Sequence, residues 1–407
     1  MIRTFCVENF LSIKDRTVIS FIASPLTDET SYENYFLNNK ERILKGMAFY
    51  GSNATGKTNI LLALETLSEI AIGITYPNKK PLPYYPFLLC GETKRKPTSF
   101  MIEFSLDDKS SNYRYSITYN STLIINEKLE KQTSQKYSIV FDRNITNSRN
   151  FIYWGKEYAS KALLNTLYHS LSPSKSYLSV FGMLNIKDLA NAYRFFKECL
   201  FHITPQMNQS SNYDIKGLEN NKQLQNFTLR LLKAADINIT NFKFAKRKIN
   251  TDIGDGYQAD VNLLLEHSCD TNKFFIDFCC ESLGTKKIFV IAQYLNQIFN
   301  KASILVVDEI ESSFHPDLTK LILALFFDKT INKCNSQLVF TSHETSLLDL
   351  DLLRREQIQF VYKDKKTQGT FIKFLKDFHV RKTDDIAKSY LAGRYDTSPD
   401  INKHSIE

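Results

Sequence analysis

The sequence predicts an α/β fold in which a mixed, mainly parallel sheet is flanked by helices. Two observations lead to this prediction. From residue 304 to residue 362, apolar runs typical of buried strands alternate with helical patterns, and this alternation indicates a parallel sheet covered on both faces. Nearer the N-terminus, the apolar run 47–50 is followed by a glycine-containing turn and then by apolar residues at helical spacing.

The composition is that of a globular chain that we expect to stay in the cytoplasm without a membrane partner. Of the 407 residues, 43% are hydrophobic and 24% are charged, which is enough apolar material for one large or two modest domains. No run approaches the roughly 18 to 20 apolar residues of a membrane-spanning helix, and the N-terminus lacks the apolar core of a signal peptide. The seven cysteines form no Cys-x-x-Cys pair, so we expect reduced thiols.

The order of elements predicts three parts. Residues 1–139 contain β-rich segments at 2–10, 17–21 and 47–50, the helix after the glycine turn, and an antiparallel β arm from 98 to 130. Residues 140–236 are predicted as an inserted helical subdomain, with helices near 156–170, 185–201 and 219–235. Residues 237–407 return to strands and helices, which are predicted as follows: strands at 241–249, 257–265 and 274–280, a helix at 286–299, a strand at 304–307, a helix to 327, a strand at 337–340, a helix to 353 and a strand at 358–362.

The strongest chemical signal is the run Gly51-Ser52-Asn53-Ala54-Thr55-Gly56-Lys57-Thr58 between a predicted strand and a predicted helix. This is a full G-x-x-x-x-G-K-[ST] match in the context that confirms a phosphate-binding loop. Backbone N–H groups of such a loop point at phosphates, Lys57 reaches the β- and γ-phosphates, and the Thr58 hydroxyl ligates Mg²⁺. We therefore expect ATP and Mg²⁺ as ligands, with Asn59, the next residue, also at the nucleotide.

A carboxylate pair follows the buried strand 304–307. Asp308 is the candidate Mg²⁺ partner, because a nucleotide site of this kind needs a carboxylate at the end of a neighbouring strand. Glu309 stands where it can accept a proton from the attacking water, the role that separates a hydrolase from a passive nucleotide binder. The alternative is a strand that ends at an ordinary polar turn.

The order of these motifs resembles ABC-type ATPase heads of the group that includes SMC proteins, RecF-like repair proteins and OLD-type ATPases. The run Glu281-Ser282-Leu283-Gly284-Thr285 resembles the ABC signature, and the resemblance implies that Ser282 and Gly284 grip the γ-phosphate held by an opposite subunit. Backbone N–H groups at a helix N-terminus can bind an anion in this way. The alternative is an ordinary N-cap with a glycine before a core helix.

His343, in the run Phe340-Thr341-Ser342-His343, resembles the switch histidine that contacts the γ-phosphate and helps to place the attacking water. The competing interpretation is structural: Thr341 and Glu344 have the spacing of a capping box, which would put His343 in the first turn of a helix. The glutamine that senses nucleotide in ABC proteins is missing from the expected region 86–89. Phe10, beside the N-terminal strand, is our candidate for stacking on adenine.

Within this group the chain is most similar to compact bacterial ATP-binding proteins of the AAA15 type. The similarity rests on the runs 9–15, 97–100 and 390–395 and on Glu127 with Leu129. Residues 390–395 also fit a plain helix end with a glycine cap. The resemblance implies an ATP-driven dimeric switch, or a higher homo-oligomer, that acts as sensor or regulator in defence against phage. It also implies a separately encoded nuclease or toxin as effector and a nucleic acid or phage protein as trigger.

Two other functions remain as alternatives. A DNA repair or chromosome-maintenance head would bind duplex DNA through basic runs at 94–96 and 243–248, although such runs are usually solvated faces. The net charge of +8 is compatible with transient contact to nucleic acid but does not require it. Intrinsic nuclease activity is disfavoured, since only about 64 residues follow His343, too few for a further domain of ordinary size.

Overall fold

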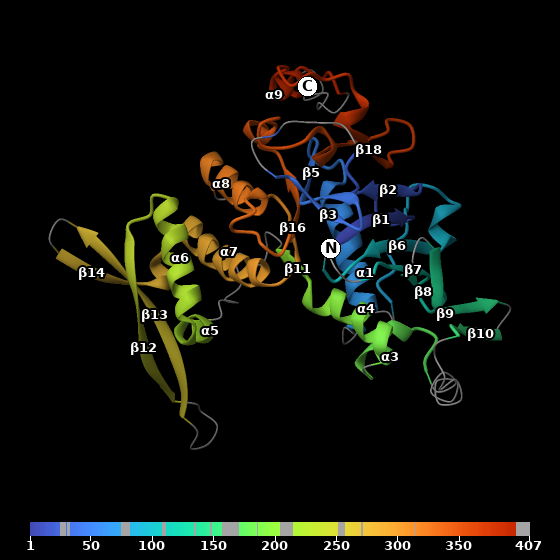
Figure 1. Ribbon diagram of the computed structural model, residues 1–407, viewed down its shortest axis with the longest axis horizontal. Helices are drawn as coiled ribbons and strands as arrows, with labels where there is room; N and C mark the ends of the chain where they lie inside the picture. Colours follow the sequence, from blue (N-terminus) through green and yellow to red (C-terminus); the bar gives the residue numbers. More distant parts are fainter. Residues whose placement is uncertain are drawn as a thin grey trace, which may run out of the picture.

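The computed structural model places most of the chain in two large sheets and a set of covering helices (Figure 1). The structure describes residues 1–24, 30, 33–74, 82–107, 111–133, 136–146, 149–156, 171–184, 186–203, 215–250, 257–269, 272–312 and 314–395. None of the helices within these ranges is long and apolar enough to cross a membrane.

The central sheet confirms the predicted parallel α/β core. Its first five strands are parallel and β18 pairs antiparallel with β17. In spatial order the strands are β11 (Leu200–Ile203), β15 (Ile304–Val307), β16 (Gln337–Ser342), β5 (Gly46–Tyr50), β17 (Ile358–Lys363) and β18 (Thr370–Phe374). Every residue of β5, β15 and β16 is buried, as expected for parallel strands with both faces covered.

Helices cover the two faces of this sheet, and the side chains of β5 show the division. Met47 and Phe49 belong to the core that also holds apolar residues of α1 (Lys57–Ile72). Ala48 and Tyr50 point the other way, into the core formed with α7 (Leu283–Asn300) and α8 (Pro316–Phe327). Because neighbouring residues of a strand face opposite sides, this short strand fastens both helical layers to the sheet.

A seven-stranded antiparallel sheet packs beside α1 and contains the predicted β arm (Figure 1). Its alternating burial pattern, most regular in β6 and β7, buries one face against the α1 core. In spatial order its strands are β10 (Arg149–Trp154), β9 (Lys136–Thr146), β8 (Ile124–Thr133), β7 (Tyr113–Tyr119), β6 (Thr98–Phe104), β1 (Ile2–Glu8) and β2 (Thr17–Ser20). A separate two-stranded sheet joins β3 (Tyr35–Asn38) to β4 (Glu41–Leu44).

Residues 140–236 are less helical than predicted. The range opens with the end of β9 and with β10, which continue the antiparallel sheet, and it later supplies β11 to the central sheet. Within its described residues the helices are α3 (Tyr177–Met183), α4 (Lys187–Glu198), α5 (Ile215–Asn220) and α6 (Lys222–Ala234). The helix predicted near 156–170 lies almost wholly outside the described residues. The apolar run at 200–203 is a strand because it pairs with β15, a tertiary contact that local periodicity does not reveal.

Beyond α6 a three-stranded antiparallel sheet projects from the body in Figure 1. It consists of β12 (Ile239–Asn250), β13 (Tyr257–Cys269) and β14 (Asn272–Asp277), so the three predicted strands are confirmed. The predicted third strand ends early, since Phe278–Cys280 form the short 3₁₀ helix η3. The side chain of Asp277 accepts the N–H of Cys279 there and turns the chain out of the sheet.

The helix predicted to run to 353 is wrong. Only the 3₁₀ turns η4 (Thr345–Leu347) and η5 (Arg355–Gln357) occupy this part. The Asp349 carboxylate accepts the N–H of Asp351, a local bond that competes with helix formation. Further on, η6 (Leu375–Asp377) and α9 (Ile386–Leu391) complete the described chain. Tyr390 and Tyr395 stack on Phe360 with ring centroids 5.4 and 4.6 Å away, and Gly393 has φ 75°, so run 390–395 forms the predicted capped helix end.

Candidate functional site

The loop 51–56 connects β5 to α1, in the context predicted for a phosphate-binding loop. Gly56, the N-cap of α1, has φ 103°, and a Cβ atom there would lie 2.2 Å from Thr370 Oγ1 and 2.6 Å from Ser12 Oγ. A Cβ at Gly51 would lie 2.2 Å from the carbonyl oxygen of Val361. Both glycines are therefore required by space, and Gly56 also by its left-handed backbone.

Lys57 lies almost fully buried beneath the loop. Its ammonium donates hydrogen bonds to the carbonyl oxygens of Gly51 at 2.8 Å and Ser52 at 3.1 Å. Burial lowers the pKa of Lys57 to about 8, although the carboxylates of Asp308 and Glu309 act to raise it. The ammonium is thus held at the centre of the loop with acceptors that phosphate oxygens can replace.

Asp308 lies at the carboxyl end of β15, opposite the first turn of α1. Thr58 Oγ1 donates to its two carboxylate oxygens at 3.2 and 3.0 Å. On its other side, Thr341 Oγ1 donates to Asp308 Oδ1 at 2.6 Å. The structure therefore brings the two predicted metal ligands together, and it adds Thr341 of β16 as a partner of Asp308.

Glu309 follows in an unusual backbone conformation, with φ 50°. Thr341 holds it there, because the N–H of Glu309 donates to Thr341 Oγ1 at 2.7 Å and the N–H of Ile310 donates to the Thr341 carbonyl at 3.1 Å. A non-glycine residue in this region costs about 1 to 3 kcal/mol and persists only when its surroundings fix it. Such strain is common at functional sites.

His343 lies just after β16, and its N–H donates to Glu311 Oε1 at 2.6 Å. The competing interpretation, a capping box, is wrong: Thr341 is a strand residue bonded to Asp308, and the Glu344 carboxylate instead accepts the N–H of Ser346 in η4. Partial burial and the nearby charge of Lys57 lower the pKa of His343. A neutral imidazole on the loop that follows β16 is consistent with the switch position, although its role stays a prediction.

Ser282 is the N-cap of α7 and is exposed, with Gly284 in the first turn of the helix. Its Oγ accepts the N–H of Thr285 at 3.0 Å, so the N-cap interpretation is confirmed. An exposed N-cap at the start of an 18-residue helix still leaves backbone N–H groups available to an anion. The signature interpretation is not excluded by the cap and stays a prediction.

Sequence reasoning missed Lys287, which lies one turn further along α7. It is 3% exposed, and its ammonium donates to the carbonyl oxygen of Ser312 in the loop after β15. Burial lowers its pKa to about 8, while the carboxylates of Glu311 and Glu309 act to raise it. The basic residue is visible in the sequence, but its burial beside two carboxylates depends on a contact between segments far apart in the chain.

Two sets of hydrogen bonds around the loop, both involving Ser12, were also missed. Asn59, which we expect at the nucleotide, donates to Ser12 Oγ at 2.6 Å, and its contact with nucleotide stays a prediction. Thr370 Oγ1 lies 2.7 Å from both Ser12 Oγ and the carbonyl oxygen of Thr55. Ser12, in the run 9–15 that carries the family resemblance, thus helps to hold the phosphate-binding loop in place. Its hydroxyl partner, Thr370, comes from β18, so only the folded sheet reveals the pair.

Phe10 is not available to stack on adenine. It is 1% exposed and packs against the ring of Phe100 at 5.4 Å in the core beside β1. The region that lacks the sensing glutamine is held instead by Asn9, whose Oδ1 accepts the N–H of Phe87 at 3.0 Å. Leu88 and Leu89, which follow, are exposed.

These features define a P-loop ATPase of the α/β class: a strand, a glycine loop with a buried lysine, and an adjoining hydroxyl and carboxylate. A scan against family models agrees: the model described as "AAA domain, putative AbiEii toxin, Type IV TA system" matches residues 47–254 and 270–349, well over half of the chain. The chain belongs to this AAA family. The predicted membership of the AAA group of P-loop ATPases is thereby confirmed.

Similar solved structures include two SMC heads and one transporter subunit. The SMC head domain from Thermotoga maritima shares 10% identity at a TM-score of 0.41, covering 92% of this chain and 98% of that one. An SMC head bound to the C-terminal winged-helix domain of ScpA shares 12% sequence identity at a TM-score of 0.43, and the match covers 92% of this chain and 98% of that one. CbiO1 of Clostridium perfringens, part of the ABC transporter complex cbiONQ, shares 11% sequence identity at a TM-score of 0.33. The match covers 93% of this chain and 90% of that one. No curated protein matches the chain.

Proposed function

We propose that the protein binds and hydrolyses ATP with Mg²⁺. The observation that carries this proposal is the continuous network from Thr58 through Asp308 and Thr341 to Glu309. A hydroxyl and a carboxylate 3.0 Å apart form a donor set that fits Mg²⁺, which takes one or two protein oxygens beside phosphate oxygens and water. Thr58 and Asp308 would hold the metal ion, which would supply positive charge to neutralise the negative charge that develops on the phosphates.

The protein's own groups have separate parts in this mechanism. The loop N–H groups and Lys57 bind and orient the phosphates. Glu309, held by Thr341, accepts the proton of the attacking water, so that the water oxygen can bond to the γ-phosphorus as the bond to the β-phosphate oxygen breaks. His343 hydrogen-bonds the γ-phosphate and fixes the direction of attack. ADP and inorganic phosphate are the products.

We further propose that two copies of the chain close around two ATP molecules. Ser282 and Gly284 are surface residues at the start of α7 and would bind the γ-phosphate on the loop 51–58 of the partner. ATP would then close the dimer and hydrolysis would open it. The chain would act as a switch, as its resemblance to ABC-type heads implies.

The test uses three variants of the full chain and two measurements, phosphate release and molar mass in solution. Glu309→Gln is expected to bind ATP, to lose hydrolysis and to accumulate as an ATP-bound dimer. Ser282→Arg is expected to stay monomeric with ATP, because the larger cation fills the space of the partner's phosphate. Ser282→Ala is the matched control and should still dimerise. Unchanged dimerisation of Ser282→Arg would contradict the shared site, and full hydrolysis by Glu309→Gln would contradict the assigned base.

At the level of the cell, we propose that this ATPase is the sensor or regulator of a bacterial defence system, controlling a separate nuclease or toxin. The family description, which names a toxin of a toxin–antitoxin system, supports a role in such a system. The test is a pull-down of Glu309→Gln from the native host, with identification of co-purifying proteins and nucleic acid. A nuclease or toxin encoded nearby would support the proposal, and duplex DNA with repair proteins would instead favour chromosome maintenance.

One observation keeps the DNA-binding alternative in view. The 3₁₀ turn η1 (Thr93–Arg95) and the residue after it expose three basic side chains, those of Lys94, Arg95 and Lys96. Lys96 Nζ lies 3.8 Å from Glu92 Oε2, which partly offsets its charge. The second basic run contributes less, since Lys243 lies over the ring of Phe275 and the side chains of residues 246–248 lie outside the described part. Binding to duplex DNA that falls steeply with salt would support this alternative.

A further inference from the structure

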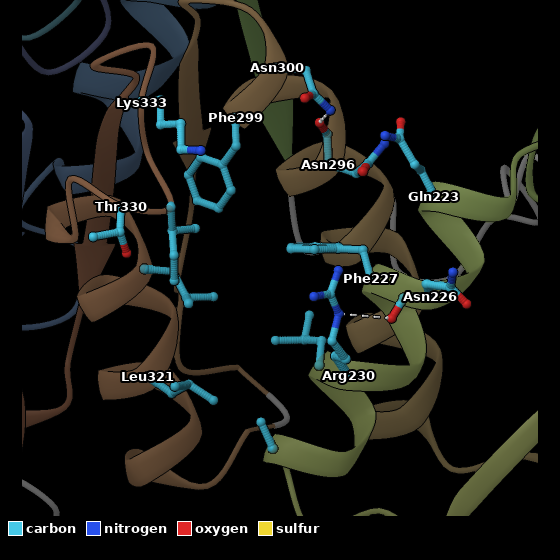
Figure 2. A pocket seen from close by; sticks show the side chains of 14 residues that line it. Gln223, Asn226, Phe227, Arg230, Asn296, Phe299, Asn300, Leu321, Thr330 and Lys333 are labelled. Atoms are coloured by element: carbon cyan, nitrogen blue, oxygen red, sulfur yellow. Dashed lines mark hydrogen bonds between the residues drawn. The ribbon is translucent and has the colours of Figure 1, made fainter.

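An open groove lies between α6, α7 and α8, on the sheet face opposite α1 (Figure 2). Its volume is about 580 Å³, within the range of pockets that hold ligands or peptide side chains. Phe227 on one wall and Leu321 on the other are partly buried apolar residues, and Phe299 lines the groove beside Lys333. The groove is separate from the phosphate-binding loop, which contributes no residue to its lining.

The apolar lining follows the walls at helical spacing. On α6, Phe227, Leu231 and Ala234 stand at positions i, i+4 and i+7, and on α8, Leu321 and Leu325 stand at i and i+4. Residues at these intervals form one stripe along a helix. Two such stripes facing each other form an elongated apolar trough, the surface that receives the apolar face of a third helix.

The rim of the groove carries only positive charge. Arg230 and Lys333 are its two ionic residues, and no carboxylate is among the residues that line it. Within the part of the chain that the structure describes, neither cation forms an ion pair, and Arg230 makes only a bond of 3.3 Å to the carbonyl oxygen of Asn226 (Figure 2). Four amide side chains complete the rim: Gln223, Asn226, Asn296 and Asn300.

From these features we propose that the groove is a docking site for an amphipathic helix of another protein, with an apolar stripe flanked by acidic residues. The apolar stripe fills the trough between Phe227 and Leu325. Its carboxylates pair with Arg230 on one side and Lys333 on the other, which sets orientation and excludes basic helices. The amides hydrogen-bond the polar edge of the guest helix.

The walls of the groove connect it to the nucleotide site. Phe299 and Asn300 stand at the end of α7, whose other end carries Ser282, and α8 follows the loop that begins at Glu309. A guest helix wedged between α6 and α8, against the end of α7, would therefore resist any change in the spacing of these three helices. This coupling rests on the proposed nucleotide switch, whereas the docking itself does not.

The first test is selection from a displayed library of 20-residue helical peptides on the purified full chain. Enriched peptides are expected to carry apolar residues at i, i+4 and i+7 with Asp or Glu beside them. Leu325→Glu should weaken their binding about tenfold or more, as expected for a central contact. The double variant Arg230→Glu with Lys333→Glu should do the same and should prefer peptides in which Lys replaces the acidic residues.

Lys320→Glu, on α8 but not in the groove lining, is the control and should bind as the unsubstituted chain does. Peptides without acidic residues, or binding that Leu325→Glu leaves unchanged, would overturn the proposal. ATP hydrolysis should be the same in all four proteins without peptide. Failure of the proposed ATPase activity is thus measured separately from failure of docking.

The second test identifies the natural occupant. A photo-crosslinking amino acid at position 325, introduced in the native host, should attach to an acidic helical segment of a different polypeptide. The adduct should be lost in the double charge variant and should be absent when the crosslinker stands at position 320. An adduct with a second copy of this chain, or with no protein, would overturn the assignment of the groove to a partner helix.

Discussion

The hydroxyl of Thr341 lies 2.6 Å from Oδ1 of Asp308, to which it donates, and it accepts the N–H of Glu309 from the same loop. One side chain on β16 thus orients both the candidate metal ligand and the candidate base, which follow β15. Their relative position is fixed by the pairing of two adjacent parallel strands. Asp308 and Glu309 are adjacent in sequence, but their geometry depends on a strand that begins at Gln337.

Replacement of Thr341 by Val should slow ATP hydrolysis while leaving ATP binding nearly intact. Valine keeps the shape and removes both hydrogen bonds, and loss of an outer-shell partner of this kind typically costs about 10- to 100-fold in activity. Steady-state phosphate release and the dissociation constant of ATP are the two measurements. Thr341→Ser, which keeps the hydroxyl, is the control. Unchanged phosphate release by Thr341→Val would show that the two hydrogen bonds are not needed for hydrolysis.

Gly56→Ala should destabilise the protein and abolish nucleotide binding. Its φ of 103° and the 2.2 Å approach to Thr370 Oγ1 leave no room for a methyl group, and such a change costs about 1 to 3 kcal/mol. Ala54 in the same loop has φ 62°, so Ala54→Gly relieves strain and is the matched control. In urea unfolding, the midpoint should fall for Gly56→Ala and should rise or stay the same for Ala54→Gly. A stable, ATP-binding Gly56→Ala would disprove the steric argument.

The affinity for ATP should fall as the pH rises above 8. Free Lys57 has a pKa of about 8, below its ordinary value, so it is protonated below pH 8 and neutral above it. Phosphate binding favours the ammonium form, so above pH 8 the protein must first take up a proton. The dissociation constant should then rise by up to about tenfold per pH unit. Titration calorimetry between pH 7 and 10 measures this slope.

Lys287 provides the control for that experiment, because its pKa is also about 8 but its ammonium bonds to the Ser312 carbonyl. Lys287→Met should keep the same pH dependence of ATP binding. If the dependence disappears in Lys287→Met, the titrating group is Lys287 rather than Lys57.

Glu127→Gln should be among the most destabilising changes outside the nucleotide site. Glu127 is fully buried, pairs with Arg143, and accepts hydrogen bonds from Tyr115, Ser176 and the N–H of Tyr177. Removal of the charge leaves the guanidinium of Arg143 buried without its counterion, at a cost of about 3 to 5 kcal/mol. Denaturant unfolding measures this loss of free energy of unfolding. Glu130→Gln on the same strand, whose partners are more exposed, should cost less than about 1 kcal/mol.

Much of the architecture was predictable because the relevant signals are local. The phosphate-binding loop, the buried strand before Asp308 and the alternation of strand and helix are all read from neighbouring residues, and each is confirmed as structure. The same is true of the antiparallel arm, whose alternating pattern in β6 and β7 reports one buried face. The family assignment followed from the order of these local motifs.

What could not be predicted depends on contacts between distant segments. The predicted helix 185–201 includes Leu200 and Phe201, but Leu200–Ile203 becomes a strand through its pairing with β15. Thr341 fitted a helix cap with Glu344 until the structure placed its hydroxyl on Asp308. Phe10 is the candidate for adenine because it lies beside the N-terminal strand, yet its ring is buried against Phe100. In each case a tertiary partner overrides a valid local preference.

The place of β5 in the sheet has a consequence for synthesis of the protein. The strand that carries the phosphate-binding loop is flanked by β16 and β17, which begin at Gln337 and Ile358. During translation, Gly46–Tyr50 leaves the ribosome long before either neighbour exists, and contacts of such long sequence separation form slowly. The nascent chain must therefore keep an apolar strand from aggregating until most of the protein has been made.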